Sequence, residues 1–273
     1  MRTLHIMRCK RSLFAFSLVE LSIVLVILGL LTGGILGGQS LIRAAELRSV
    51  ATQFQQYNTA VQSFRDKYFA LPGDMRNAQA FWGTAHATPA TCYSTASTST
   101  ATCNGNGDGW VYFDTSTSNE PFRFWQHLAN AGLIEGQYTG VLATTHVHST
   151  TTANAPRGKI ANSFWFAHDW ANVKGASIGD TSFFSGNYGN TLQLGSFITD
   201  YSPNDPVLKP EEAWNIDTKL DDGKPGTGSM VVLASAGLST CTTTATNNPA
   251  TLTADYLLSA SNIACGLLFR GMY

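Results

Sequence analysis

The sequence predicts an α+β protein with a long N-terminal helix and a C-terminal head built on an antiparallel sheet. Three observations support this fold class. Residues 16–38 form an almost unbroken apolar run, residues 47–68 carry an apolar stripe at heptad spacing, and short strand-like segments with turn residues between them occupy the chain beyond residue 160. Strands that follow a helix, rather than alternate with helices, favour the α+β class over a parallel α/β sheet.

The apolar run 16–38 is long enough to cross a bilayer, for which about 20 residues suffice. Four basic residues and no acidic ones precede it, and they predict a cytoplasmic N-terminus: Arg2, Arg8, Lys10 and Arg11. The only charged side chain from Phe16 through Ile42 is Glu20. A carboxylate costs a few kcal/mol in hydrocarbon, so one found there usually has a partner and a function.

The helix is expected to continue through residues 39–68 and to end before Leu71-Pro72-Gly73. Its apolar residues alternate at spacings of three and four: Leu47, Val50, Phe54, Tyr57, Val61, Phe64 and Tyr68. Such a stripe serves either as a seam between chains or as the face by which a helix holds its own domain. The glycines at 33, 34, 37 and 38 indicate either close helix packing in a membrane or a place where the helix can loosen.

Beyond residue 70 the pattern predicts short helices first and strands later. We expect a helix from Met75 to about Trp82 capped by Asp74, a second within Asn119–Gly136 capped by Asn119, and a third at Pro210–Leu220. The expected strands are Ile160–Ala167, Leu192–Ile198, Ser229–Ala234 and Ala264–Phe269. Tracts rich in Thr, Ser and Ala at 84–103, 139–155 and 239–253 are expected to be exposed loops.

Four of the five cysteines lie beyond the apolar run: Cys92, Cys103, Cys241 and Cys265. An even number in an exported region favours two disulfides, most simply Cys92–Cys103 and Cys241–Cys265, because each of these pairs closes a local loop. Four cysteines allow three pairings, so the connectivity stays open at this point. Neither pair has the short spacing of a zinc site.

The start of the apolar run resembles a known family. Residues 15–20, AFSLVE, look like the processing motif of type IV pilins and type II secretion pseudopilins. In that family a short basic leader is cut just before a Phe, the new amino group is methylated, and a Glu lies four residues further on. The resemblance implies cleavage between Ala15 and Phe16, with Glu20 satisfying the cationic amine of Phe16 on an adjacent subunit. The residue before the cut is usually Gly in the family and is Ala15 here.

The resemblance implies a division of the chain and a set of partners. Residues 1–15 would be the cleaved leader, 16–38 the transmembrane and polymerisation stalk, 39–70 its continuation packing on the head, and 71–273 the periplasmic or extracellular head. The implied partners are a prepilin peptidase, an inner-membrane assembly platform, the membrane, and other copies or related subunits in a filament. The LPGD, NGNGDG, WQHLANAGLI and IDTKLDDGKPGTG segments look more loosely like one large bacterial pilin-like subfamily.

Calcium is the candidate metal, at either of two oxygen-rich segments. In residues 104–109, NGNGDG, glycines alternate with the oxygen side chains of Asn104, Asn106 and Asp108, like the start of a calcium loop. The bidentate Glu of such a loop is missing, and Thr115 stands at its position. The alternative interpretation is a structural glycine-rich turn that binds no metal.

The second oxygen-rich segment is Asp217, Asp221 and Asp222. The first two are four residues apart on the predicted helix 210–220 and would repel each other unless solvated or neutralised. The alternative to a metal site here is a negatively charged helix end whose Asp side chains cap backbone amides.

The sequence therefore favours a membrane-anchored filament subunit, located in the bacterial inner membrane and then in a periplasmic or cell-surface filament, and not an enzyme. A secretory signal would have a shorter apolar region and a small-x-small cleavage site, and a plain anchor leaves Glu20 unexplained. Charged residues are only 13% with a net charge of −1, which counts against nucleic-acid binding. The alternative is a membrane-tethered periplasmic enzyme or carbohydrate-binding protein that uses tryptophans: Trp82, Trp110, Trp125, Trp165, Trp170 and Trp214.

Overall fold

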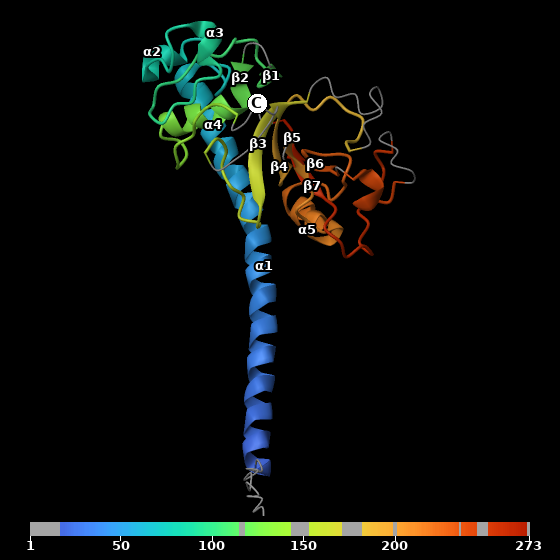
Figure 1. Cartoon of the computed structure of the whole chain (residues 1–273). Coiled ribbons are helices and arrows are strands. Elements are labelled where there is room, and N and C mark those ends of the chain that lie inside the picture. Colours follow the sequence, from blue (N-terminus) through green and yellow to red (C-terminus); the bar gives the residue numbers. More distant parts are fainter. Residues whose placement is uncertain are drawn as a thin grey trace, which may run out of the picture. The chain divides into compact units, whose positions relative to one another are not determined.

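A computed structural model describes residues 17–114, 118–142, 153–170, 182–198, 201–234, 236–244 and 251–271. The expected cleavage site between Ala15 and Phe16 lies outside the described residues, as does Thr115. The chain divides into two compact units, residues 1–45 and 46–273. Figure 1 follows the order of the elements along the chain.

Helix α1, Leu18–Tyr68, contributes to both units. In the first unit its apolar side chains are exposed, and the helix is long and apolar enough to cross a membrane. The helix is continuous through Gly33 and Gly38. It ends where the sequence predicts: Phe69 adopts a left-handed backbone conformation (φ 53°), and Pro72 follows shortly.

In the second unit, the part of α1 from residue 46 onward buries one face in the hydrophobic core. Val50, Tyr57, Val61 and Phe64 are buried, and the remaining stripe residues pack against the same core at half-buried positions: Leu47, Phe54 and Tyr68. The stripe is therefore the face by which the helix holds its own head. The buried face also includes a polar residue beside the stripe, Gln53.

Gln53 lies among the apolar residues of α1, and both ends of its side-chain amide are hydrogen-bonded there. Its side-chain oxygen accepts from the indole N–H of Trp165 (3.2 Å) and the backbone N–H of Lys159 (3.1 Å), and its amide donates to the carbonyl of Arg157 (3.3 Å). A buried amide without such partners would cost about 1–3 kcal/mol. These bonds therefore fix the register of α1 against the segment that leads into the sheet.

The sheet is antiparallel throughout and has five strands: β3 Ser163–Asp169, β4 Asn190–Ile198, β5 Tyr201–Asp205, β6 Met230–Leu233 and β7 Gly266–Phe269. Its order is β3-β4-β7-β6, with β5 paired to β4 beyond a register shift. Trp165 lies opposite Leu194, and Leu194 opposite Leu267, so large apolar residues align across the sheet on one face. This confirms the four expected strands, and β5 is an addition to them.

The helices of the head are α2 Ala78–Trp82, α3 Pro89–Cys92, α4 Glu120–Asn130 and α5 Pro210–Leu220, with a 3₁₀ turn η1 Leu238–Thr240. Two short strands, β1 Phe113–Asp114 and β2 Ser118–Asn119, pair just before α4. The third expected helix, α5, has the bounds predicted from the sequence. The tract 84–103 is more structured than expected, because it contains α3 and buries Ser97 and Thr102.

The two expected helix caps are wrong. Helix α2 begins at Ala78, not Met75, and its N–H at Gln79 is capped from a distance by the side chain of Asn104 (2.9 Å). Asn119 precedes α4 but makes no side-chain cap; its amide donates to the carbonyl of Tyr93 instead. Both local predictions fail because a partner distant in sequence uses the group.

The core forms between α1, α4 and one face of the sheet. Tyr57 contacts Trp125 of α4 and Trp165 of β3 edge-on, with ring centroids 5.0 and 5.5 Å apart, and Phe54 stacks on Phe269 of β7 at 4.2 Å. The other face of the sheet is covered by a smaller cluster that includes Phe183, Tyr188, Val231, Leu233 and Leu268.

Two disulfides join Cys92 to Cys103 and Cys241 to Cys265, the pairing that the sequence favours. The first closes the loop after α3 and the second connects the end of η1 to the residue before β7. All four cysteines are buried. Each bridge therefore fixes a loop to the core of the head.

Candidate functional site

The carboxylate of Glu20 lies at the start of α1, in its first turn. Its Oε2 accepts the backbone N–H of Ser17 at 2.9 Å, and the Ser17 hydroxyl accepts the N–H of Val19 at 3.3 Å. A negative charge in the first turn is favoured by the helix dipole and by the free N–H groups there. The side chain thus points back toward the residues that precede the helix, where the sequence resemblance places the new amino terminus.

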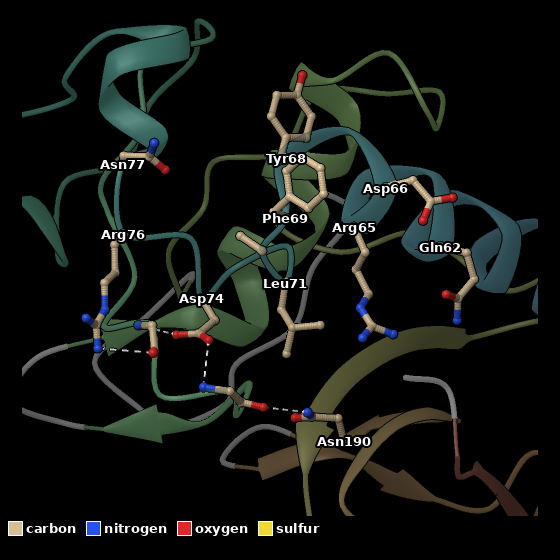
Figure 2. A pocket seen from close by; sticks show the side chains of 13 residues that line it. Gln62, Arg65, Asp66, Tyr68, Phe69, Leu71, Asp74, Arg76, Asn77 and Asn190 are labelled. Carbon is tan, nitrogen blue, oxygen red and sulfur yellow. Dashed lines mark hydrogen bonds between the residues drawn. The ribbon is translucent and has the colours of Figure 1, made fainter.

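In the head, Asp74 binds the NGNGDG loop rather than a helix. Its carboxylate accepts the backbone N–H groups of Gly107, Asp108 (3.1 Å) and Gly109 (2.9 Å), as Figure 2 shows in part. Three N–H groups around one carboxylate form a backbone nest that holds the loop by charge-assisted bonds. Burial raises the pKa of Asp74, although these N–H groups act in the opposite direction.

Glu120, the first residue of α4, binds the same loop. We call Asp74, Glu120 and the loop 104–109 the Asp74 junction. Glu120 is fully buried, and its two oxygens accept the N–H groups of Asn106 and Tyr112, both at 3.1 Å. Burial raises the pKa of Glu120 to about 8, and the nearby Asp74 and Asp108 add to the rise. The residue therefore holds the middle of the loop and the segment just after it at the N-terminus of α4.

The loop packs so closely on the segment Leu71–Asp74 that one of its positions requires glycine. A Cβ at Gly105 would lie 2.4 Å from the carbonyl oxygen of Gly73 and 2.5 Å from the backbone of Asp74. On the other side, Arg76 donates to the carbonyls of Asn106 (2.6 Å) and Gly107 (3.1 Å). Asn190 of β4 then ties the loop to the sheet through Gly109 and Val111.

The expected metal residues of this loop are thus only partly brought together. Asp108 lies with Asp74 and Glu120, with one oxygen from each within 4.8 Å of the others, whereas the Asn104 oxygen faces α2. The Asn106 oxygen accepts the N–H of Asp108 (2.8 Å), and an oxygen of Asp108 accepts the N–H of Trp110 (2.9 Å). These oxygens serve the loop's own backbone, which is the geometry of a structural turn.

A buried polar network lies behind the junction, along α4. His127 accepts the N–H of Gly73 (3.0 Å) on Nδ1 and contacts the Thr102 hydroxyl (3.0 Å) through Nε2. Burial lowers the pKa of His127 to about 3, so the ring is neutral. The guanidinium of Arg123, also buried, donates to the carbonyl of Cys92 at 2.8 Å. The network fixes the first disulfide loop to α4.

A surface hollow of about 1000 Å³ adjoins this junction (Figure 2). The end of α1 supplies Arg65 and Asp66, and the segment after it supplies Phe69, whose side chain is 94% exposed. Asp74 also lines the hollow, but its oxygens are used by the loop N–H groups. The hollow is therefore a surface depression of mixed polar and apolar lining beside a structural turn.

The tryptophans do not gather at this hollow. Trp125 and Trp165 are fully buried in the core, and Trp82 is half-buried against it. Trp110 and Trp214 are partly exposed, and no tryptophan lies among the described residues that line the hollow. Core packing is the use of tryptophan that the head shows most clearly.

The second acidic segment does come together at the end of α5. Asp217, Asp221 and Asp222 each place an oxygen within 4.8 Å of the others. Asp217 is fully buried and accepts the hydroxyl of Tyr256 at 2.7 Å on Oδ2. Burial raises the pKa of Asp217 to about 7, with the charges of Asp222 and Asp221 adding to it and the Tyr256 hydroxyl and Gly223 amide opposing it.

The loop after α5 encloses these carboxylates. Asp221 accepts the N–H of Met230 at 2.9 Å, and Asp222 accepts the N–H of Lys224 (2.8 Å) and the hydroxyl of Thr227 (2.6 Å). A Cβ at Gly228 would lie 1.8 Å from an Asp221 oxygen, so the backbone rests directly on that carboxylate. The predicted capping of backbone amides is therefore found for Asp221 and Asp222.

Comparison of the chain with family models, with curated proteins and with solved structures found no match.

Proposed function

We propose that the chain is a pilin-like or pseudopilin structural subunit, processed by a prepilin peptidase and assembled through α1 into a helical filament. The observation that carries the proposal is the position of Glu20. This carboxylate lies in the first turn of a long apolar helical segment whose large side chains are exposed, one turn from the expected new amino terminus.

The physical argument concerns the cost of an isolated charge. In the bilayer, Glu20 can be neutralised by a proton, or by the amine of its own chain, since its carboxylate already faces back toward Ser17. In a packed bundle of helices, the amine of Phe16 on a neighbouring subunit offers the opposite charge. During assembly, Glu20 would exchange the amine of its own chain for the amine of a neighbouring chain. Its charge would then favour the assembled state.

The rest of the molecule is consistent with a passive subunit. The head is cross-linked by two buried disulfides, which suit an oxidising compartment outside the cytoplasm. Its buried charged and polar groups hold loops in place, as Asp74, Glu120 and Arg123 do. The alternative, a tethered enzyme or carbohydrate-binding protein, would draw support from aromatic residues around a cleft, and the tryptophans do not provide it.

Processing and assembly are tested together by intact-mass analysis of filaments sheared from cells and of the membrane fraction. We expect a mature chain that begins at Phe16 and carries an N-methyl group, present in the filament fraction. Abundant protein on the surface supports a pilus subunit, and retention in the membrane after cleavage supports a pseudopilin.

The Ala15→Leu variant is the matched test of the cleavage site. A bulky residue before the cut should leave uncleaved precursor in the membrane. Normal processing of this variant, or a mature terminus near Ala44 or Ala45, would contradict the proposal and favour an ordinary secretory signal.

A further inference from the structure

The carboxylates of Asp217, Asp221 and Asp222 differ from the other acidic cluster of the head in one respect. In the Asp74 junction, both oxygens of Asp74 and of Glu120 accept backbone N–H groups. At the end of α5, Oδ1 of Asp217 is buried and has no donor with hydrogen-bond geometry among the described residues, although the Gly223 amide lies near this carboxyl. A buried carboxylate oxygen without a partner is costly, so its presence calls for a ligand or a proton.

The three carboxylates are close enough together to share one cation. Each of the three residues places an oxygen within 4.8 Å of the others. Calcium takes oxygen ligands in a flexible geometry at about 2.3–2.6 Å, so it can be shared by carboxylates at this separation. Magnesium requires near-octahedral geometry and is usually held by one or two carboxylates, so a group of three favours calcium. All the side-chain donors are carboxylates, which are hard ligands.

The charge and the access also suit a cation. The ammonium of Lys224, two residues beyond Asp222, forms its ion pair with Asp255 (2.5 Å), although the charge of Asp222 also acts on it. Asp217 is buried, Asp221 is half-buried and Asp222 is exposed, so the cluster is closed on one side and open to solvent on the other. An ion can therefore enter past Asp222 and keep water molecules as its remaining ligands.

We propose that Asp217, Asp221 and Asp222 form a calcium site that fastens the loop 222–230 to the end of α5. The ion supplies the missing partner of Asp217 and relieves the repulsion between the three carboxylates. Because the same loop leads into β6, a bound ion stabilises the junction between α5 and the sheet. The inference concerns the head alone and does not depend on whether the chain assembles into filaments.

The experiment is thermal unfolding of the full chain in detergent micelles, followed by tryptophan fluorescence, with CaCl₂, MgCl₂ or EGTA at equal ionic strength. Calcium at about 100 times its Kd should raise the Tm by at least about 4 °C over EGTA. MgCl₂ should give a smaller rise. Equal melting in CaCl₂ and EGTA, or an equal rise with MgCl₂, would overturn the proposal.

Three variants separate this site from the alternatives. Asp222→Asn changes an exposed residue and should abolish the calcium-dependent rise, as should Asp217→Asn, whereas Asp108→Asn in the other cluster should keep it. Asp217→Asn also mimics a protonated carboxyl that donates to a neighbouring carboxylate. If the wild type and this variant melt alike in both CaCl₂ and EGTA, a shared proton holds the cluster and the site does not exist. Loss of the rise in Asp108→Asn with retention in Asp222→Asn would move calcium to the NGNGDG loop and equally contradict the proposal.

Discussion

The two ends of α1 carry similar apolar residues in different surroundings. In residues 18–45 the large side chains are exposed, with Leu18 at 83%, whereas Val50, Val61 and Phe64 beyond residue 46 are completely buried. The second part is covered by the helix's own head. The first part needs apolar surroundings from another source, either a bilayer or neighbouring helices. One helix thus joins a segment buried in the core to a segment that is apolar and exposed.

Two glutamates at helix N-termini repeat this contrast. Glu120 begins α4, is fully buried, and receives a backbone N–H on each oxygen. Glu20 lies in the first turn of α1, is exposed, and receives one N–H, from Ser17. Glu120 thus has both oxygens bonded inside the head, whereas Glu20 is exposed with one N–H bond. We therefore expect changes at the two ends of α1 to act on different properties.

The largest effect on stability is expected from Phe64→Ala. This ring is buried in the core against Tyr68 and Trp82, with centroids 4.6 and 6.2 Å away. Truncation leaves a cavity and should lower the free energy of unfolding by about 3–5 kcal/mol. Thermal unfolding in detergent measures the loss. Leu28→Ala, in the exposed part of the same helix, is the matched control and should leave the unfolding of the head unchanged; similar losses for both would remove the contrast.

A smaller, pH-dependent effect is expected from Glu120→Gln. The pKa of Glu120 is about 8 in the folded chain, against 4.5 for an ordinary glutamate. Between these two values the folded chain keeps a proton that the unfolded chain has released. The contribution of this carboxyl is thus complete at low pH and is lost as the pH rises through 8, by up to about 1.4 kcal/mol per pH unit.

Unfolding by denaturant at pH 5 and pH 8 measures this dependence. Glu120→Gln should be less stable than wild type at pH 5, because the amide nitrogen cannot accept the second N–H, and the difference should shrink toward pH 8. Glu135→Gln, at an exposed position, should keep the wild-type slope. An unchanged slope in Glu120→Gln would show that the buried carboxyl does not titrate as described.

The features that the sequence predicts well are those with a local, periodic signal. The stripe from Leu47 to Tyr68 repeats every third or fourth residue, and the buried face of α1 follows it. Helix α5 has Pro at its start and Lys in its last turn, and its bounds agree with the prediction. The disulfides follow from short separations along the chain, 11 and 24 residues.

The features that the sequence does not predict depend on partners far along the chain. Asp74 has the spacing of a helix cap, yet it binds N–H groups more than 30 residues away. In the sequence, Glu120 looks like an ordinary acidic residue in a first helical turn. Its burial depends on the loop that packs over it. No local spacing in the sequence indicates that Asp74 and Glu120 lie close to Asp108.

Strand β5 and the core residue Gln53 were missed for related reasons. The segment Tyr201–Asp205 contains Ser, Pro, Asn and Asp, which favour a turn, but it pairs with the end of β4. Gln53 lies beside the apolar stripe and looks like a surface residue in the sequence, and only the folded chain supplies the Trp165, Lys159 and Arg157 groups that bind it. In both cases tertiary contacts override the local preference.

The most direct test of the central claim is the amount of protein in sheared filaments for wild type and Glu20→Gln. The substitution removes the charge that the account assigns to assembly, and Asp66→Asn, which removes an exposed carboxylate further along the same helix, is the control. Both variants should keep wild-type leader cleavage, membrane insertion and Tm of the head. The account predicts that Glu20→Gln is depleted from the filament fraction at equal membrane levels, while Asp66→Asn is not. Wild-type incorporation of Glu20→Gln would contradict the claim and leave a plain membrane anchor as the better account.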